Sequence, residues 1–200
     1  MGIIALLTVL LLGVVMRARH QARDAGCKSN LGQLWKAVNY YANSHKDTLF
    51  VNIASPLRIS NAVYKNTQYS GWGHLYPKYL LDNRILYCPG DPVRDLEWAD
   101  FGWRHWETEE GEVQCSYGYR GRQGIVAEET TALTLSEIER NPQKIIGCDF
   151  YETFTAPVRV HHPSHINVLR CNGGVGQVNK IVSFGPEADD FQAALDALDL

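Results

Sequence analysis

The fold is decided by one stretch near the N-terminus, GIIALLTVLLLGVVMRARHQARDAGCKSNLGQLWKAVNYYANS, residues 2–44. It contains no proline, and its internal glycines are isolated, so no residue in it interrupts a helix. At ~1.5 Å per residue, a helix of roughly 40 residues is ~60 Å long, about twice the diameter of a small domain. The sequence therefore predicts one N-terminal helix, part of which lies outside the core of its own domain.

The second half of this helix has the pattern of a helix that packs on a globular domain. From Asn30 onward, apolar residues recur at i, i+3, i+4 and i+7, which places them on one face. These residues are Leu31, Leu34, Trp35, Val38 and Tyr41 with Ala42. We therefore expect residues 17–45 to continue the helix and to pack against a head formed by residues 46–185.

The first half, residues 1–16, is apolar on every face, which suits lipid better than a protein core. The side chains that we assign to a membrane anchor are Ile3, Ile4, Leu6, Leu7, Val9, Leu10, Leu11, Leu12, Val14 and Val15. The run from Ile3 to Met16 has only fourteen residues, whereas a membrane span needs ~20. It also lacks the basic start and the cleavage site of a signal peptide. We expect it to be the downstream part of a truncated membrane anchor.

The composition is that of a folded domain with an appendage. Of the 200 residues, 45% are hydrophobic, which allows one domain with a real core. The net charge of −3 argues against nucleic acid as the main partner. The tail, residues 186–200, carries five acidic side chains and no basic ones, and Pro186 stands at its start. Its pattern predicts a C-terminal amphipathic helix.

Between the long helix and the tail, the pattern is that of short strands and turns. We expect a short helix at 75–81, a turn at 88–92, a polar and aromatic insertion at 93–112, and a second short helix capped by Thr134 or Ser136. Strand-like segments lie at 114–121, 144–150, 158–162, 166–172 and 174–181. Asn172-Gly173, between the last two, is a strong hairpin signal. The predicted fold class is α+β, with the long helix on a small antiparallel sheet.

Four stretches of the chain resemble, in the same order, proteins of the type IV pilin and type II secretion pseudopilin superfamily. They are residues 17–49, the CPGDP turn at 88–92, the SYG element at 116–118, and residues 161–175. The closest resemblance is to bacterial prepilin-like proteins whose C-terminus carries a His, nine residues and then Asp-Gly. The chain departs from that motif at Asn172, which replaces the Asp before Gly173, and it lacks the Phe-Thr-Leu-Ile-Glu string of a prepilin cleavage site.

The resemblance implies a non-enzymatic structural or assembly protein of a type II secretion or type IV pilus-like system. It implies a single-pass protein of the cytoplasmic (inner) membrane, with its head in the periplasm or outside. Its partners would be the membrane and other pilin-like subunits, which it would contact through the N-terminal helix. Arg17, Arg19 and Arg23 do not decide the orientation, because charges upstream of the apolar run would change the balance.

The resemblance also bears on the cysteines and on His162. Cys27 and Cys88 fall at family positions, which implies a disulfide between the helix and the head. Cys148 and Cys171 lie on strands that could be neighbours and could also pair, which would leave Cys115 free. Sequence alone does not fix this connectivity. The family position of His162 implies a structural role together with Asn172 and Gly173, in which its ring bonds to the turn backbone.

An alternative function is a membrane-anchored periplasmic binding module, for sugar or metal, on a pilin scaffold. The insertion at 93–112 could stack sugars through its aromatic residues, or it could fold over the sheet. The aromatic residues are Trp98, Phe101, Trp103 and Trp106. The chain has no nucleophile elbow, HExxH motif or phosphate-binding glycine loop, so we expect no enzymatic activity.

The sequence offers candidate ligands for a metal ion, and no cofactor is predicted. The histidines His161, His162 and His165 could bind zinc together with Asp149 or Cys171, although their spacing matches no known ligand set, and polar surface or hairpin support is the simpler interpretation. Asp149 and His162 are the candidates within this group. Calcium is conceivable at Asp91, Asp95, Asp149 and Glu152, but no loop carries acids at the required spacing.

Overall fold

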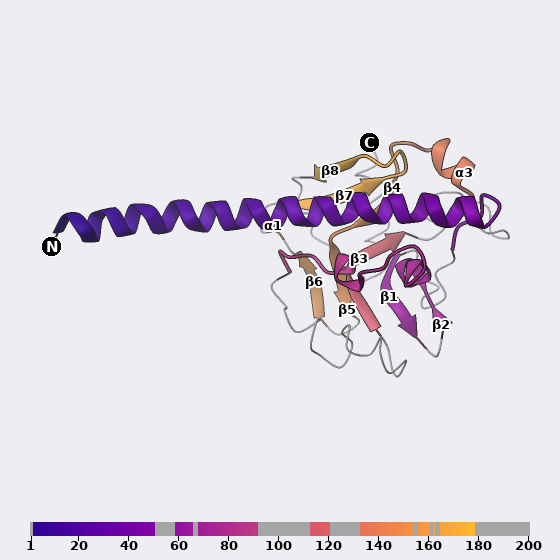
Figure 1. The fold of residues 1–200 in the computed structure, drawn as a ribbon, viewed down its shortest axis with the longest axis horizontal. Coiled ribbons are helices and arrows are strands. Elements are labelled where there is room, and N and C mark those ends of the chain that lie inside the picture. The colour runs from indigo at the N-terminus through magenta and orange to yellow at the C-terminus, as the bar shows by residue number, and fades with distance from the viewer. Residues whose placement is uncertain are drawn as a thin grey trace.

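The computed structural model of the chain describes residues 2–50, 59–65, 68–91, 113–120, 133–153, 156–160, 162 and 165–178. In this part, one long helix lies across a six-stranded antiparallel sheet, accompanied by a two-stranded sheet (Figure 1). The architecture is α+β, as the sequence predicts. The aromatic insertion at 93–112 and the helix expected at 186–200 fall outside the described residues.

The long helix α1 runs without interruption over Gly2–Ser44. Its N-terminal half projects away from the head, and its C-terminal half crosses the sheet (Figure 1). Four residues of the predicted stripe are fully buried: Leu31, Leu34, Val38 and Ala42. Trp35 and Tyr41 flank them and are partly buried against the same core. The helical period therefore predicted the packing face correctly.

The six-stranded sheet has the order β2-β1-β3-β4-β7-β8, with antiparallel neighbours throughout. Its strands are β1 (Ile59–Lys65), β2 (Gln68–Tyr69), β3 (Val113–Arg120), β4 (Ile145–Cys148), β7 (Ile166–Arg170) and β8 (Val175–Val178). The two-stranded sheet consists of β5 (Phe150–Thr153) and β6 (Ala156–Val160). Helix α1 contacts β7 and β8, and also the short 3₁₀ helices η1 (Gly71–Leu75) and η2 (Asn83–Leu86). It therefore joins the middle of the chain to the last strands.

Five of the strands, β3, β4, β6, β7 and β8, overlap segments that the sequence predicts as strands. The sequence pattern does not predict strand β1. Its pairing with β3 is irregular on either side of Ala62, and the consecutive residues Ala62, Val63 and Tyr64 are all buried. Irregular pairing of this kind removes the alternation by which a half-buried strand is recognised.

The helix predicted at 75–81 is wrong. η1 ends at Leu75, and Tyr76 is extended, with φ −89° and ψ 145°. Pro77 follows, and a proline disfavours the helical conformation of the residue before it. Residues 76–79 form a turn instead, in which the Tyr79 N–H donates to the Leu75 carbonyl oxygen at 2.8 Å. The next helical segment is η2, where the Asp82 side chain accepts a hydrogen bond from the Arg84 N–H at 3.0 Å.

The short helix α3 (Leu135–Glu139) is present, and the structure decides between its two candidate caps. The Thr134 hydroxyl oxygen accepts from the Glu137 N–H at 3.2 Å, and the Glu137 carboxylate accepts from the Thr134 N–H at 2.8 Å. This reciprocal pair satisfies backbone donors at the helix start that have no intrahelical partner. Thr134 is therefore the cap.

The core is aromatic where η1 meets the sheet. Trp72 is fully buried, and its ring centroid lies 4.9 Å from that of Tyr119 on β3. The Tyr119 hydroxyl donates to the Phe50 carbonyl oxygen at 3.2 Å. Trp72 also packs directly on Gly147 of β4, where a Cβ atom would lie 2.6 Å from the indole. The ring therefore fixes the distance between η1 and the sheet.

The C-terminal hairpin is confirmed. Strands β7 and β8 pair from Ile166↔Val178 to Leu169↔Val175. Gly173 has a φ of +79°, a conformation that favours glycine, as the Asn-Gly signal predicts. The turn lies against α1, because the Trp35 indole packs on Gly173.

Candidate functional site

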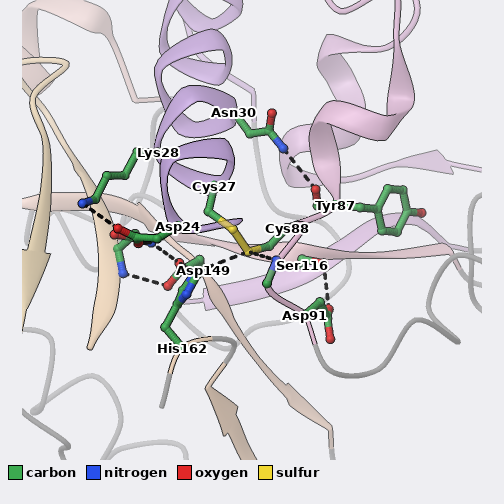
Figure 2. Close-up of a disulfide and its surroundings, with 12 residues drawn as sticks. Asp24, Cys27, Lys28, Asn30, Tyr87, Cys88, Asp91, Ser116, Asp149 and His162 are labelled. Atoms are coloured by element: carbon green, nitrogen blue, oxygen red, sulfur yellow. Dashed lines mark hydrogen bonds and ion pairs between the residues drawn. A yellow bond between two sulfur atoms is a disulfide. The ribbon is translucent and has the colours of Figure 1, made fainter. Parts of the chain in front are cut away.

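A disulfide joins the long helix to the head, as the family resemblance implies (Figure 2). Cys27 of α1 and Cys88, two residues after η2, have a Cα–Cα distance of 5.0 Å and are separated by 61 residues in the sequence. Both residues are buried. One turn further along α1, the Asn30 side chain donates to the Tyr87 carbonyl oxygen at 3.0 Å. The segment that follows η2 is thus fixed to the helix twice.

The second pairing, between Cys148 and Cys171, is wrong, because neither cysteine forms a disulfide, and both are buried. Their strands are neighbours, but Cys148 pairs with Val168, and Cys171 lies beyond the far end of β7, where its N–H bonds to the Lys144 carbonyl oxygen. Three residues along a strand cover ~10 Å, and a disulfide needs Cα atoms within ~7 Å. Cys115 is free, as expected. Burial raises the pKa of the Cys115 thiol to about 12.

His162 and Asp149 meet beside the disulfide. His162 Nε2 lies 3.2 Å from Asp149 Oδ2 and 3.6 Å from Cys88 Sγ. Both residues are buried, and Asp149 is completely inaccessible. Burial raises the pKa of Asp149, although hydrogen bonds from His162 and Asn167 oppose this effect. The structure therefore brings the two residues suggested by the sequence as metal candidates into direct contact.

His162 does not contact the hairpin turn in the way that the resemblance implies. It forms a bridge with His165, which directly precedes β7, whereas the turn at Asn172 and Gly173 follows that strand. The ring is stacked on His165, with centroids 4.8 Å apart, and its Nε2 faces the Asp149 carboxylate. Its packing role lies at the opposite end of β7 from the turn.

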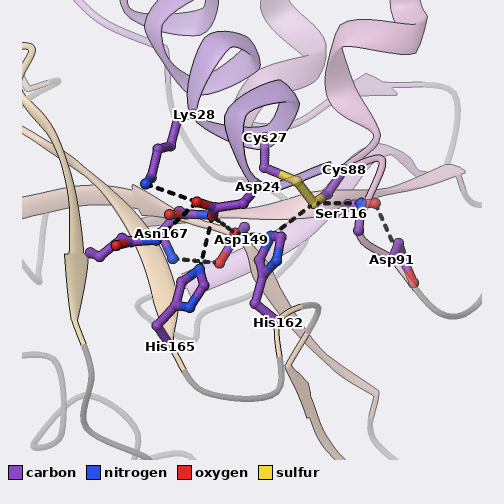
Figure 3. Close-up of polar contacts among 12 residues, drawn as sticks. Asp24, Cys27, Lys28, Cys88, Asp91, Ser116, Asp149, His162, His165 and Asn167 are labelled. Atoms are coloured by element: carbon purple, nitrogen blue, oxygen red, sulfur yellow. Dashed lines mark hydrogen bonds and ion pairs between the residues drawn. A yellow bond between two sulfur atoms is a disulfide. The ribbon is translucent and has the colours of Figure 1, made fainter. Parts of the chain in front are cut away.

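A second carboxylate, Asp24, attaches α1 to the last two strands (Figure 3). Asp24 accepts from Lys28 Nζ at 2.9 Å, from Asn167 Nδ2 at 2.8 Å and from Gln177 Nε2 at 3.0 Å, and its Oδ1 lies 2.9 Å from His165 Nε2. Partial burial alone would raise the pKa of Asp24, but the hydrogen bonds from Lys28, Asn167 and His165 hold it well below its usual range. Asp24 is therefore a charged clamp between the helix and the hairpin.

Asn167 connects the two carboxylates. Its Nδ2 donates to Asp24 at 2.8 Å and to Asp149 at 2.7 Å, and its backbone N–H donates to Asp149 Oδ1 at 2.8 Å. The residue is completely buried. Asn167 belongs to a predicted strand, but its role as a bridge requires α1, β4 and β7 to meet, and no local pattern reveals that meeting.

Two groups of metal-ligand side chains occur among the described residues. In each group, one ligand atom from every residue lies within 4.8 Å of all the others. One group consists of Cys27, Cys88, Asp149 and His162, and the other of Asp24, His162 and His165. Cys171 belongs to neither, and His161 lies outside the described residues. The sequence pattern did not predict Cys27 and Cys88 as ligands together with Asp149 and His162. The four residues come from distant segments, and their spacing in the sequence matches no known metal-binding motif.

Among the described residues, no group of candidate ligands has the oxygen-rich composition of a calcium site. Asp91 accepts from the Ser116 hydroxyl at 2.9 Å and is in neither group of candidate ligands. Each group contains a single carboxylate, whereas calcium prefers 6–8 oxygen ligands. Asp95 and the side chain of Glu152 lie outside the described residues.

The projecting half of α1 is the second candidate site. Eight large apolar side chains in its first sixteen residues are exposed: Ile3, Leu7, Leu10, Leu11, Leu12, Val14, Val15 and Met16. The side chains of Ile4, Leu6 and Val9 lie outside the described part. Within the described chain, no helix combines the length and the hydropathy that a membrane crossing requires. Directly after the apolar run, Arg17, Arg19 and Arg23 are exposed.

No known protein family, curated protein or solved structure matches the chain. The geometry therefore presents two features for a functional argument. One is the apolar, exposed half of α1. The other is the buried cluster of Cys27, Cys88, Asp149 and His162, where the helix meets the head.

Proposed function

We propose that this chain is a pseudopilin-like, membrane-anchored structural protein that takes part in a type II secretion or type IV pilus-like assembly. The single observation that carries the proposal is the division of α1 into two halves. One unbroken helix buries an apolar stripe in the head through its second half and exposes apolar side chains through its first half. No catalytic step is part of this function.

The exposed half of α1 favours a lipid or helical environment. Complete burial of a large aliphatic side chain contributes about 1.5–3 kcal/mol, and eight such side chains are exposed along the first sixteen residues. Exposed apolar surface of this kind marks an interaction with a membrane or with other proteins. The run from Ile3 to Met16 extends ~21 Å at ~1.5 Å per residue, less than the ~30 Å of a bilayer core. We therefore propose anchoring together with packing against equivalent helices of other subunits.

The attachment of α1 to the head supports an assembly role. The Cys27–Cys88 disulfide and the Asp24 clamp hold the helix to two different segments of the head, the turn after η2 and the β7–β8 hairpin. A covalent bond and a charged, hydrogen-bonded contact resist separation of the two parts. A force applied to the helix within a filament would therefore be transmitted to the head without detachment.

Membrane fractionation tests the anchor. The full chain, produced in bacteria, should sediment with membranes and be released by detergent but not by high salt. Simultaneous replacement of four exposed apolar residues with Asn should move it to the soluble fraction: Leu10, Leu11, Val14 and Val15. A matched control places Asn at four exposed positions further along α1 and should stay with the membrane: Ala18, Ala22, Ala25 and Gln33. A wild-type chain in the soluble fraction would overturn the proposal.

Cross-linking separates an assembly protein from the alternative, an anchored binding module that does not polymerise. The buried cluster of cysteine, histidine and aspartate is the observation that favours the metal-binding version of this alternative. A Val14→Cys variant in membranes should form cross-linked dimers if the projecting helices pack together. A Lys36→Cys variant, exposed on the head-packed half, serves as the control and should not. Membrane association without cross-linking at Val14 would favour the binding module.

A further inference from the structure

We propose that Cys27, Cys88, Asp149 and His162 form a Zn²⁺ site when the disulfide is reduced, so that the bridge and the metal are alternative ways of joining α1 to the head. The four residues come from separate segments: α1, the turn after η2, the link between β4 and β5, and the segment before β7. Their ligand atoms all lie within 4.8 Å of one another. The inference extends beyond assembly and does not depend on it.

The chemistry of this donor set is that of zinc. Two thiolates, an imidazole and a carboxylate are all ligands that Zn²⁺ takes, usually four at a time in a tetrahedron. Bonds of ~2.0–2.3 Å separate the ligand atoms of a tetrahedral site by ~3.3–3.8 Å. His162 Nε2 lies 3.2 Å from Asp149 Oδ2 and 3.6 Å from Cys88 Sγ. These two separations already correspond to the edges of such a tetrahedron.

The two sulfur atoms must move apart. In the disulfide they are bonded, and in a zinc site they would stand ~3.8 Å apart. The Cα atoms are 5.0 Å apart, and Cys27 and Cys88 belong to different elements, so rotation of the side chains or a small shift of the turn separates the sulfurs. Their burial excludes the water that would otherwise compete for the metal.

The surroundings support bound ligands. The Gly90 N–H lies 3.3 Å from Cys88 Sγ and can donate a hydrogen bond to a thiolate there. Asp149 is oriented by Asn167, which donates to both of its oxygens at 2.8 and 2.7 Å. Hydrogen bonds of this kind fix the orientation of ligands in metal sites. Gly90 also allows the His162 ring to approach, because a Cβ atom there would lie 2.6 Å from it.

The exchange between the two states balances in electrons and protons. A dithiol or phosphine reductant gives two electrons to the Cys27–Cys88 bond, which takes up two protons, from the dithiol or from water, and becomes two thiols; the reductant is oxidised. Zn²⁺ then displaces the two thiol protons to the solvent and accepts the lone pair of His162 Nε2, in the tautomer whose proton is on Nδ1. Oxidation by a disulfide donor removes two electrons, re-forms the bridge and releases Zn²⁺.

The redox chemistry predicts that the reduced, zinc-bound state precedes the disulfide-bonded state. A newly made chain is reduced, and thiols persist in the cytoplasm but pair outside it. Zinc would therefore hold the helix to the head first, and the disulfide would replace it afterwards. The order rests on the proposed export of the head, whereas the metal site itself does not.

Metal analysis of the detergent-solubilised full chain tests the site. The chain is treated with a phosphine reductant and a chelator, freed of both, and incubated with Zn²⁺ alone. We expect one zinc ion per reduced chain and at least tenfold less in the oxidised chain. In place of zinc, Co²⁺ should give the sulfur-to-metal charge-transfer absorption of a thiolate site. A reduced, folded chain without zinc would overturn the proposal.

Two matched pairs of variants locate the ligands. Cys88→Ser should lower the zinc content at least tenfold, whereas Cys171→Ser, at a buried cysteine outside both the disulfide and the group, should retain it. His162→Asn should lose zinc, whereas His165→Asn should retain it. Retention in Cys88→Ser with loss in His165→Asn would contradict the site and favour the group that contains Asp24. Because loss of zinc could follow from misfolding, circular dichroism accompanies each variant, and a folded Cys88→Ser chain should lose the Co²⁺ charge-transfer band together with the metal.

Discussion

Trp35 of α1 packs directly on Gly173 in the turn of the C-terminal hairpin, so closely that a Cβ atom on Gly173 would overlap the indole ring. The contact joins the head-packed half of the helix to the last described turn of the chain. Gly173 also has a φ of +79°, so two independent constraints select glycine there. The hairpin is thus held by packing at its turn and by the Asp24 clamp at its strands.

Replacement of Gly173 with alanine should destabilise the head. The Cβ atom would force the indole away and would also be strained at this φ, so we expect the free energy of unfolding to fall by about 2–4 kcal/mol. Urea denaturation measures this change. Gly32→Ala is the control, because Gly32 lies within α1 with no atom near the added Cβ, and it should stabilise by up to ~1 kcal/mol. An equal effect of the two substitutions would contradict the packing argument.

The Asp24 clamp should make stability depend on pH in the acidic range. Hydrogen bonds from Lys28, Asn167 and His165 lower the pKa of Asp24 in the folded chain. A lowered pKa contributes stability that is fully present above the unfolded value of ~3.9, and this contribution is lost progressively as the pH falls from there through the lower pKa of the folded chain. Asp24→Asn should therefore destabilise at pH 7, and its difference from the wild type should shrink steadily as the pH falls below ~3.9. Urea midpoints measured across this range would show no convergence if the charge were unimportant.

A negative charge at Asn167 should be severely destabilising. Asn167→Asp removes the donor that Asp24 and Asp149 share and places a third carboxylate between them, at a completely buried position. We expect a loss of about 3–5 kcal/mol, as for an unpaired buried charge. Gln177→Glu is the matched control, because Gln177 also donates to Asp24 but is exposed. Gln177→Glu should lower the free energy of unfolding by less than ~1 kcal/mol. If the two variants had similar urea midpoints, the role of Asn167 as a bridge between Asp24 and Asp149 would be contradicted.

Removal of the disulfide should weaken the attachment of α1. A bridge that closes 61 residues contributes about 4 kcal/mol through the entropy of the unfolded chain. The oxidised wild type should thus exceed the Cys27→Ser, Cys88→Ser double variant by about this amount in free energy of unfolding. Chelator is present so that zinc does not contribute. Peptide mapping without reduction should find this single bridge and thiols at Cys115, Cys148 and Cys171, and a bridge between Cys148 and Cys171 would contradict the structure.

Local patterns in the sequence predicted several elements correctly. The buried face of α1, the hairpin at Asn172-Gly173 and the start of α3 each depend on residues within a few positions of one another. The period of a helix, the turn preference of Asn-Gly and a capping pair all act over such distances. The helix predicted at 75–81 failed because the conformation before Pro77 prevailed over the apolar spacing.

The sequence by itself determined that α1 has two halves, one with an apolar stripe and one apolar on every side, because side-chain direction in a helix follows from position alone. The tertiary structure decided which distant residues meet. It brought Cys27 and Cys88 together with Asp149 and His162, and it separated Cys148 from Cys171 on neighbouring strands. The physical reason is that strand register and helix placement are set by packing over the whole head, and local spacing carries no information about them.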